Sequence, residues 1–318
     1  MRIHKCRGSL LLLLAILLLP SLALSQAKVG TTGVNFLELG VSARAMGMAE
    51  AFTAGVDDAS AVFYNPAGMV YVYGREIMLT HIEMPADINY EFVGMVTPLE
   101  AVGGVVGIGV YSLNTGDIPY TSYEYWNGRD AAGNMQYFSA GDIAVSVSYA
   151  RYLTDKFSLG VTAKYIREDL SEYSATGWAA DVGTIYNSGY KNFKIAMLIS
   201  NFGPDMKFIQ KEFPLPINFK FGASIDFIDM DDHRVMLAAE GAHPADNLEK
   251  YNVGLEYQYL NRFTLRVGER LNYDSDGFTA GGGLTIPLGD EMDLSVNYAY
   301  QDFGFLNEVH RFSLGISF

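Results

Sequence analysis

The sequence predicts an all-β protein: a transmembrane antiparallel β-barrel of fourteen strands with a small helical segment inside it. Three observations support this prediction. From Arg75 onward, apolar residues recur at every second position in a series of short runs. The connections between these runs alternate between short and long. A segment rich in small residues precedes the first run and shows neither the period of a strand nor the composition of a turn.

The composition narrows the class of protein. The chain has 318 residues, of which 49% are hydrophobic and 18% are charged, and its formal net charge is −14. Such an acidic chain argues against a nucleic-acid partner, because nucleic-acid binding needs a basic surface. No later stretch approaches the length of a membrane-spanning helix, so a membrane location requires a barrel.

Residues 1–25 have the features of a secretory signal peptide. Basic residues precede a short apolar core, Leu10 to Leu19, and small residues follow at Ala23 to Ser25. The apolar core is too short for a membrane anchor, so we expect cleavage near Ser25 or Gln26. Because the exported chain is also predicted to form a barrel, we expect it in the bacterial outer membrane. Cys6 leaves with this peptide, so we expect no disulfide in the mature chain.

Fourteen runs show the alternation expected of a strand with one lipid-facing side. An even number suits a single-chain bacterial barrel whose two ends lie on the same side of the membrane. The predicted strands are Ile77–Ile82, Ile88–Val96, Val105–Tyr111, Ile143–Tyr149, Phe157–Tyr165, Trp178–Tyr186, Phe193–Ile199, Ile217–Phe227, Val235–Ala239, Tyr251–Tyr259, Phe263–Val267, Phe278–Ile286, Met292–Tyr300 and Val309–Phe318.

The alternating connections separate a barrel from a soluble β-sandwich. Outer-membrane barrels have short periplasmic turns and longer outside loops, whereas a sandwich has no reason to sort its loops in this way. The longest connection, Ser112 to Gly141, contains aromatic residues that predict either a recognition surface or a girdle at the lipid headgroups. These residues are Tyr120, Tyr123, Tyr125, Trp126 and Tyr137.

The last strand contains a further signal. Phe312, Leu314, Ile316 and Phe318 alternate with small residues and end the chain. This pattern resembles the signal that the barrel-assembly machinery of the outer membrane recognises, so we expect that machinery and outer-membrane lipid as partners. The alternative is an ordinary edge strand that happens to come last.

A barrel of fourteen strands leaves a lumen to be filled. Strands about 4.8 Å apart and tilted about 40° give a backbone diameter of roughly 28 Å, whereas an eight-stranded barrel fills itself with side chains. We therefore divide the chain into a signal peptide (1–25), a hatch (26–74) and a barrel (75–318). Within the hatch, Leu37 to Met69 is the segment expected to plug the lumen.

Charged hatch residues suggest how the plug is held. Arg44 can pair with Asp57 or Asp58 and hold the hatch in a gated position. Alternatively, Arg44 pairs with a lumen carboxylate such as Glu91 or Asp181 and contributes only stability. A buried charge needs a partner in either case.

Apolar hatch residues are candidates for contacts with a hydrophobic ligand, because methionine suits a site that accepts varied shapes. Packing against the wall is the alternative. Glycine weakens or kinks a strand, so a glycine-rich run predicts a lateral opening in the wall. The candidate ligand contacts are Phe36, Leu37, Met46, Met48, Phe52, Phe63 and Met69, and the candidate opening comprises Gly103, Gly104, Gly107 and Gly109.

No catalytic motif is evident, and we predict no enzyme and no cofactor. The acidic run Asp229 to Asp232, next to His233, is expected in a tight turn rather than at a metal. Asp274 to Gly277 resembles the start of a calcium loop but lacks its downstream glutamate, so we expect no metal site.

An ordered set of hatch residues shows a family resemblance. It comprises Gly40, Arg44, Gly47, Ala49, Ala51, Phe52 and Ala54, then the run Asp57 to Ala61, then Tyr64, Asn65, Pro66, Ala67 and Gly68. This set resembles the N-terminal hatch of FadL-like outer-membrane proteins, and more closely their PorV/PorQ branch. With the leader, the strands and Phe318, the resemblance covers essentially the whole chain. Asn65 and Pro66 are expected to set a backbone turn rather than to touch a ligand.

The resemblance implies two functions. PorV-like members receive cargo after translocation by the type IX secretion system, and PorQ-like relatives are associated with that system. FadL-like members carry long-chain fatty acids and other hydrophobic molecules across the outer membrane past a gating hatch. We therefore expect a protein of type IX secretion, with secretion components or cargo as partners, and a passive hydrophobic transporter as the alternative. A structural barrel is a third hypothesis; a continuous apolar tunnel would favour transport, and a sealed lumen the partner role.

Overall fold

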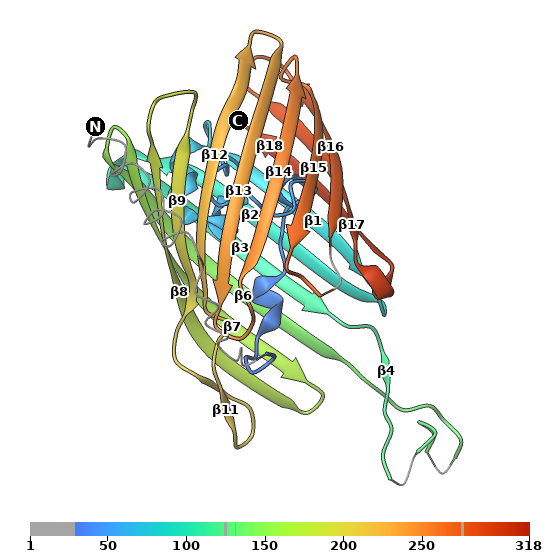
Figure 1. Cartoon of the computed structure of the whole chain (residues 1–318). Helices are drawn as coiled ribbons and strands as arrows, with labels where there is room; N and C mark the ends of the chain where they lie inside the picture. Colours follow the sequence, from blue (N-terminus) through green and yellow to red (C-terminus); the bar gives the residue numbers. More distant parts are fainter. Residues whose placement is uncertain (1–28, 124–125, 131, 275–276) are drawn as a thin grey trace, which may run out of the picture.

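The computed structural model describes residues 29–123, 126–130, 132–274 and 277–318. The predicted signal peptide and its cleavage position lie outside these residues, as does part of the loop from Asp274 to Gly277. The described chain forms one closed barrel of fourteen antiparallel strands, which confirms the predicted fold class (Figure 1). Each barrel strand pairs with its neighbours in the sequence, and the first strand closes the ring against the last.

The barrel strands of the described chain have the following bounds. They are β1 (Glu76–Met84), β2 (Ile88–Leu99), β3 (Gly104–Asn114), β6 (Ala140–Thr154), β7 (Phe157–Leu170), β8 (Tyr173–Asn187), β9 (Lys194–Phe202), β12 (Asn218–Met230), β13 (His233–Pro244), β14 (Lys250–Tyr259), β15 (Phe263–Leu271), β16 (Phe278–Pro287), β17 (Asp293–Asp302) and β18 (Glu308–Ser317).

Many of these strands are longer than the apolar runs that predicted them. The run Ile143–Tyr149 lies within β6, and the run Val235–Ala239 lies within β13. A ladder hydrogen bond needs only N–H and C=O groups, so pairing continues past the last apolar residue. The polar strand ends therefore extend the wall beyond its apolar band.

Strand β15 shows which side chains face outward. Phe263, Leu265 and Val267 are 55%, 65% and 46% exposed, whereas Thr264 and Arg266 between them are 6% and 5% exposed. Because side chains alternate across a strand, apolar residues cover the outside of the ring and polar or small residues line the lumen. This arrangement is that of a wall surrounded by lipid.

The two ends of the barrel differ. At one end, short turns join β6 to β7, β12 to β13 and β14 to β15. At the other end, longer connections carry two small hairpins, β4 (Ile118–Pro119) with β5 (Tyr137–Phe138), and β10 (Met206–Lys207) with β11 (Glu212–Phe213). We call the second the outer end; it points downward in Figure 1.

The hatch lies inside the ring and consists of short helical turns and irregular chain. It contains η1 (Asn35–Glu38), α2 (Ala43–Gly47), α3 (Ala61–Tyr64) and η2 (Pro66–Tyr71), while η3 (Glu100–Val102) and η4 (Gly304–Leu306) lie in connections. The Ser42 hydroxyl caps α2 by accepting a hydrogen bond from Ala45 N at 3.4 Å. Among the described residues, no helix has the length and apolar character needed to cross a membrane.

Candidate functional site

The hatch runs through the lumen from one end of the barrel to the other. At the outer end, Gly33 N donates to Pro214 O at 3.1 Å, and the Thr32 hydroxyl donates to Asp246. At the inner end, Arg75 and Phe318 exchange two backbone hydrogen bonds of 2.8 Å each. The candidate site is therefore the hatch together with the wall residues that face it.

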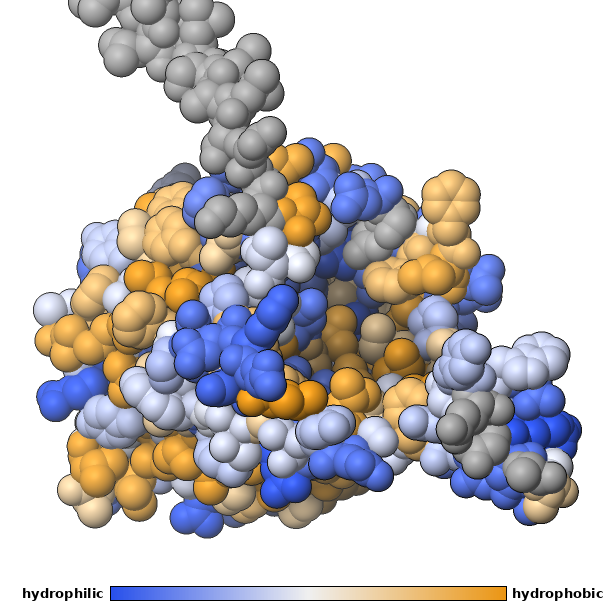
Figure 2. Space-filling model, turned by 90° about the horizontal axis from the view of Figure 1, so that it is seen from below, coloured by the Kyte–Doolittle hydropathy of each residue, from blue (hydrophilic) through white to orange (hydrophobic). Residues whose placement is uncertain are grey.

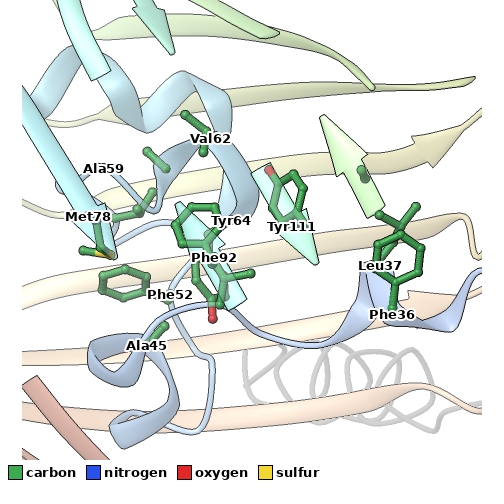
Figure 3. Packing of buried hydrophobic residues seen from close by; sticks show 14 of the residues in the cluster. Phe36, Leu37, Ala45, Phe52, Ala59, Val62, Tyr64, Met78, Phe92 and Tyr111 are labelled. Atoms are coloured by element: carbon green, nitrogen blue, oxygen red, sulfur yellow. The ribbon is translucent and has the colours of Figure 1, made fainter. Parts of the chain in front are cut away.

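One part of the hatch packs on the wall through aromatic and aliphatic side chains (Figure 3). The rings of Phe52 and Tyr64 meet edge to face with centroids 5.6 Å apart. The ring centroid of Phe63 lies 5.9 Å from that of Tyr111, and the Tyr111 centroid lies 5.3 Å from that of Phe92. Aromatic pairs at these separations stabilise a core beyond the area that they bury.

The predicted ligand contacts lie in this packing or beside it. Phe36, Leu37, Met46, Met48, Phe52 and Met69 are all buried, and Phe63 is partly buried against the same cluster. Leu37 and Phe63 border a small cavity of about 30 Å³, and Met46 borders a larger one at the outer end. Packing against the wall accounts for their burial, and contact with a ligand stays a prediction.

Arg44 is the centre of a charged cluster. Its guanidinium contacts Asp57 at 2.5 Å and Asp58 at 3.2 Å, both within the hatch. It also donates two hydrogen bonds, of 2.9 and 3.0 Å, to Glu256 on β14. Arg266 on β15 contacts the same Glu256 at 2.7 Å. The pairing predicted within the hatch is thus present, together with a wall carboxylate that the sequence analysis did not name.

The alternative partners suggested for Arg44 bind elsewhere. Glu91 was predicted to face the lumen, but it lies on the outside of the wall, where it contacts His81 at 2.6 Å. Asp181 contacts Lys164 at 2.7 Å and is fully buried on the lumen side. A gating role of Arg44 stays a prediction, because a static ion cluster shows only how the hatch is held.

The two hatch carboxylates differ in their acidity. Burial disfavours the charge on Asp57, but Arg44 and the nearby cations outweigh it, so the pKa of Asp57 lies below its usual range. At Asp58, burial and then the neighbouring charge of Asp57 outweigh Arg44, so the pKa of Asp58 is raised. Within the hatch, Asp57 is therefore the more acidic partner of Arg44 and Asp58 the less acidic one.

Wall side chains also hold the hatch backbone. Glu240 on β13 accepts hydrogen bonds from the N–H groups of Phe52 and Thr53 at 3.2 and 3.0 Å. The hydroxyl of Thr279 accepts from Ala49 N at 3.0 Å. These contacts satisfy backbone groups that the short hatch helices leave unpaired.

The Asn-Pro-Ala-Gly block forms the turn that the sequence predicts. The Asn65 carboxamide accepts from Ala67 N at 3.1 Å and donates to Thr53 O at 3.1 Å. Pro66 opens η2, where its missing N–H is harmless. On the adjacent wall strand β7, a Cβ at Gly160 would overlap the backbone of Pro66 and Ala67. The block is a structural element that lies directly on the wall.

Two further hatch glycines, Gly47 and Gly68, mark close approaches. A Cβ at Gly47 would lie 3.1 Å from Arg266 Cβ and 3.2 Å from Gly281 Cα on the wall, and a Cβ at Gly68 would overlap Val56 within the hatch. Gly68 therefore leaves no room for a side chain, and a side chain at Gly47 would require its wall neighbours to shift by a few tenths of an ångström.

The structure contradicts a lateral opening at Gly103, Gly104, Gly107 and Gly109. Strand β3 pairs without a register shift with β2 on one side, from Asn89↔Asn114 to Leu99↔Gly104, and with β6 on the other. A Cβ at Gly107 would lie 2.5 Å from both Met69 Sδ and Val62 Cγ1 of the hatch. Gly104, Gly107 and Gly109 therefore make room for close packing within an unbroken strand, whereas Gly103 lies in the turn before β3 at a positive φ of 63° with open space around it.

Two cavities of about 340 Å³ flank the hatch. The inner one is lined by charged residues that include Arg44, Asp57 and Arg234. The outer one is bordered by Glu38, Met46 and other hatch and wall residues. Figure 2 looks onto the outer end, where the surface is hollowed and both hydrophobic and hydrophilic side chains border the hollow.

Sequence reasoning also missed the buried pair of Lys164 and Asp181. The pairing of β8 with β9 shifts register beside Asp181, and Asp181 accepts a hydrogen bond from Asn201 N at 2.8 Å. The alternation of β7 places Lys164 on the lumen side, and a lumen-facing lysine was the sequence feature that could have predicted a buried ion pair.

On the last strand, Phe312, Leu314 and Phe318 are exposed on the outside and Ile316 is partly buried. Their role in barrel assembly stays a prediction.

Comparison with known proteins identifies the family. The family model described as type IX secretion system protein PorV matches residues 23–243 of the chain. The chain belongs to the PorV family. A search of the curated proteins found no significant match for this PorV-family barrel.

Solved structures agree on the fold. The CymD monoaromatic hydrocarbon channel is 14% identical, with 88% of this chain and 98% of that chain covered and a TM-score of 0.57. The Ralstonia pickettii toluene transporter TbuX is also 14% identical, with coverages of 85% and 96% and a TM-score of 0.54. At these identities the likeness shows a shared FadL-type barrel and nothing finer. The protein is thus an outer-membrane barrel of the PorV family, associated with type IX secretion.

Proposed function

We propose that this PorV-family barrel receives exported proteins at the outer surface of the outer membrane and passes them on, with its lumen closed by the hatch. The observation that supports this proposal best is the way the hatch is held. It is bound by the Arg44 cluster, by backbone hydrogen bonds to Glu240 and Thr279, and by close packing at Gly107 and Gly160. A lumen closed in this way favours work at the outer loops, and no catalytic step belongs to the proposal.

A deletion strain of the source bacterium tests the proposal. Proteins exported by the type IX system should accumulate inside the cell or remain unattached, and the wild-type chain should restore their normal location. Unchanged export and attachment in the deletion strain would contradict the proposal. Mass spectrometry of the mature chain tests the associated cleavage near Ser25 or Gln26.

A second candidate is passive transport of hydrophobic molecules. It is favoured by the apolar hatch packing and by the cavities on both sides of the hatch. Transport would require the hatch to move, and Arg44→Ala removes the centre of the charged cluster that opposes such movement.

Liposomes containing the purified barrel separate the two candidates. If the barrel transports, uptake of a long-chain fatty acid should exceed that of empty liposomes and rise in the Arg44→Ala variant. Arg167→Ala is the matched control, because Arg167 pairs with Asp169 on the exposed outside of β7. Uptake equal to empty liposomes for all three proteins would remove the transporter candidate.

A further inference from the structure

The outer part of strand β8 lacks a neighbour on one side. Strand β8 pairs with β7 along almost its whole length, from Leu170↔Tyr173 to Phe157↔Tyr186. Its pairing with β9 extends outward only to Ala180↔Phe202. Beyond Phe202 the chain leaves the wall; Gly203 approaches the Trp178 carbonyl and Met206 packs on Gly177, but within the described chain no strand pairs with Tyr173 to Thr176 on that side. We call these residues the open edge.

The turn between β7 and β8 determines which backbone groups point to the open edge. Of its two central residues only Ser171 has a positive φ, 55°, which is the geometry of a type II′ hairpin. In such a hairpin the flanking pair, Leu170 and Tyr173, exchanges hydrogen bonds, and the bonded pairs then alternate along the ladder. Ser174 and Thr176 therefore direct their N–H and C=O groups away from β7. Neither backbone forms a hydrogen bond on that side with another described residue.

The open edge lies in water rather than in lipid. Tyr165 and Trp178 face each other across β7 and β8, are 54% and 58% exposed, and have the character of an aromatic girdle residue. Beyond them the outward side chains are polar: Arg167 pairs with Asp169, and Ser174 and Thr176 are exposed. Unpaired backbone in hydrocarbon is unfavourable, but above the headgroups it is free to bind.

We propose that the open edge binds an extended segment of a partner protein, which adds to β8 as a further strand. A strand edge that presents N–H and C=O groups in register is complementary to another extended backbone and to little else. The inference deepens the proposed function, on which it rests only for the identity of the partner as an exported protein.

A second copy of this chain does not fit the open edge. Two copies in one membrane share their orientation, so a two-fold axis between them must run along the membrane normal. Barrel strands tilt by about 35–45°, and two copies of β8 related by that axis would cross at roughly 80°. Strands crossing at that angle cannot form a ladder, which leaves a segment of another protein as the occupant.

The negative charge at the tip of the β7–β8 hairpin indicates which end of the partner segment should be basic. A cavity of about 910 Å³ lies at the tip, lined by Ser171 to Tyr173 and by Asp130 and Tyr137 of the β3–β6 connection. A strand antiparallel to β8 carries its C-terminal residues toward this tip. The carboxylates of Glu172 and Asp130 there favour a segment that ends in a basic residue.

The probe for the test is a peptide of about eight residues, at about 3.3 Å each, that alternates threonine and valine and ends in arginine. The control is the same peptide N-methylated along its backbone, which keeps the side chains and removes the donors. Hydrogen exchange of the Ser174 and Thr176 amides in the detergent-solubilised barrel should slow by about tenfold with the probe and stay unchanged with the control. No slowing, or equal slowing by both peptides, would overturn the proposal.

Substitutions in the barrel give an independent readout of the same contact. Thr176→Pro removes an edge-facing N–H without breaking the ladder to β7, and it should weaken probe binding by roughly threefold to tenfold. Thr176→Val keeps the N–H and should bind like the wild type. Equal affinity of the proline and valine variants would overturn the proposal. Because these measurements use a purified barrel and a synthetic peptide, they can fail while the secretion assay succeeds, and the reverse.

Discussion

The two sides of the barrel wall hold the hatch by different means. On the side of β13 to β17 the wall presents charged and polar groups, among them Glu240, Glu256 and Arg266, which bind hatch backbone or Arg44. The hatch backbone also lies close to glycines there, at Gly254 and Gly268. On the side of β3 to β8 the wall presents glycines and small residues, and the hatch backbone lies directly on positions such as Gly160. The hatch is thus close-packed on glycines on both sides, and the side of β13 to β17 adds the ionic contacts to Arg44.

The difference shows how the hatch, a segment of small residues, is fixed in one placement within the lumen. Van der Waals packing against glycine allows close approach but discriminates weakly between similar placements. Charge-assisted hydrogen bonds to fixed wall groups act at defined distances and therefore select one placement. We infer that the packed side contributes contact area, whereas the charged side determines where α2 lies along the barrel.

The largest effect is expected on the charged side. Glu256→Ala leaves Arg44 and Arg266 without their shared carboxylate, and breaking a buried pair of this kind costs about 3–5 kcal/mol. Thermal unfolding in detergent, followed by circular dichroism, should show a clear fall in Tm. Glu91→Ala, which removes an exposed carboxylate on the outside, is the control and should change stability by less than about 1 kcal/mol. Similar losses in both variants would show that the ionic side does not hold the hatch.

The next effect tests the packed side. Gly160→Val places a side chain where Pro66 and Ala67 lie, and overpacking of this kind costs about 1–3 kcal/mol. Gly116→Val is the matched control, because a Cβ at Gly116 meets Asp87 only at ordinary contact distance, 3.7 Å. The expected outcome is a lower unfolding temperature for the Gly160 variant alone. A Gly160 variant as stable as the wild type would show that the hatch does not lie against β7.

An effect of similar size is expected at the turn that joins the two surfaces. Asn65→Ala loses the hydrogen bonds to Ala67 N and Thr53 O and leaves those groups buried, at a cost of about 1–3 kcal/mol. Asn89→Ala, at an exposed position of β2, should be close to neutral. The midpoints of urea unfolding, compared at equal m-values, measure the difference in stability between the two variants. An Asn65 variant as stable as the wild type would show that this turn does not help to hold the hatch.

The smallest effect is a dependence on pH. Because the pKa of Asp57 is lower in the folded chain than in the unfolded chain, its stabilising contribution is complete above its unfolded pKa and is lost as pH falls through its folded value. Asp58, with a raised pKa, acts in the opposite direction and favours the folded state as pH falls. Asp57→Asn should therefore reduce the loss of Tm between neutral and strongly acid pH, and Asp58→Asn should increase it. An unaltered acid profile in both variants would contradict these assignments.

The sequence predicted the wall better than the contacts inside it. All fourteen barrel strands were recognised, because alternation of apolar residues is a direct consequence of one lipid-facing side. Glycines on β3 were misassigned to an opening, since glycine marks both a weak strand and a close approach, and only the position of Met69 distinguishes the two. The wall partner of Arg44 was missed because Glu256 lies far along the chain, and only the closed ring brings the two together.

The sequence by itself determined the class of the protein: a lipid-surrounded wall of alternating strands, a small-residue hatch and the order of short and long connections. These are local properties of chain segments, and they do not depend on how the ring closes. The tertiary structure decided which charges meet, which glycines face the hatch and where β8 loses its neighbour. Those features depend on the register between strands and on the end of β9 at Phe202, and neither is encoded in the periodicity of any single strand.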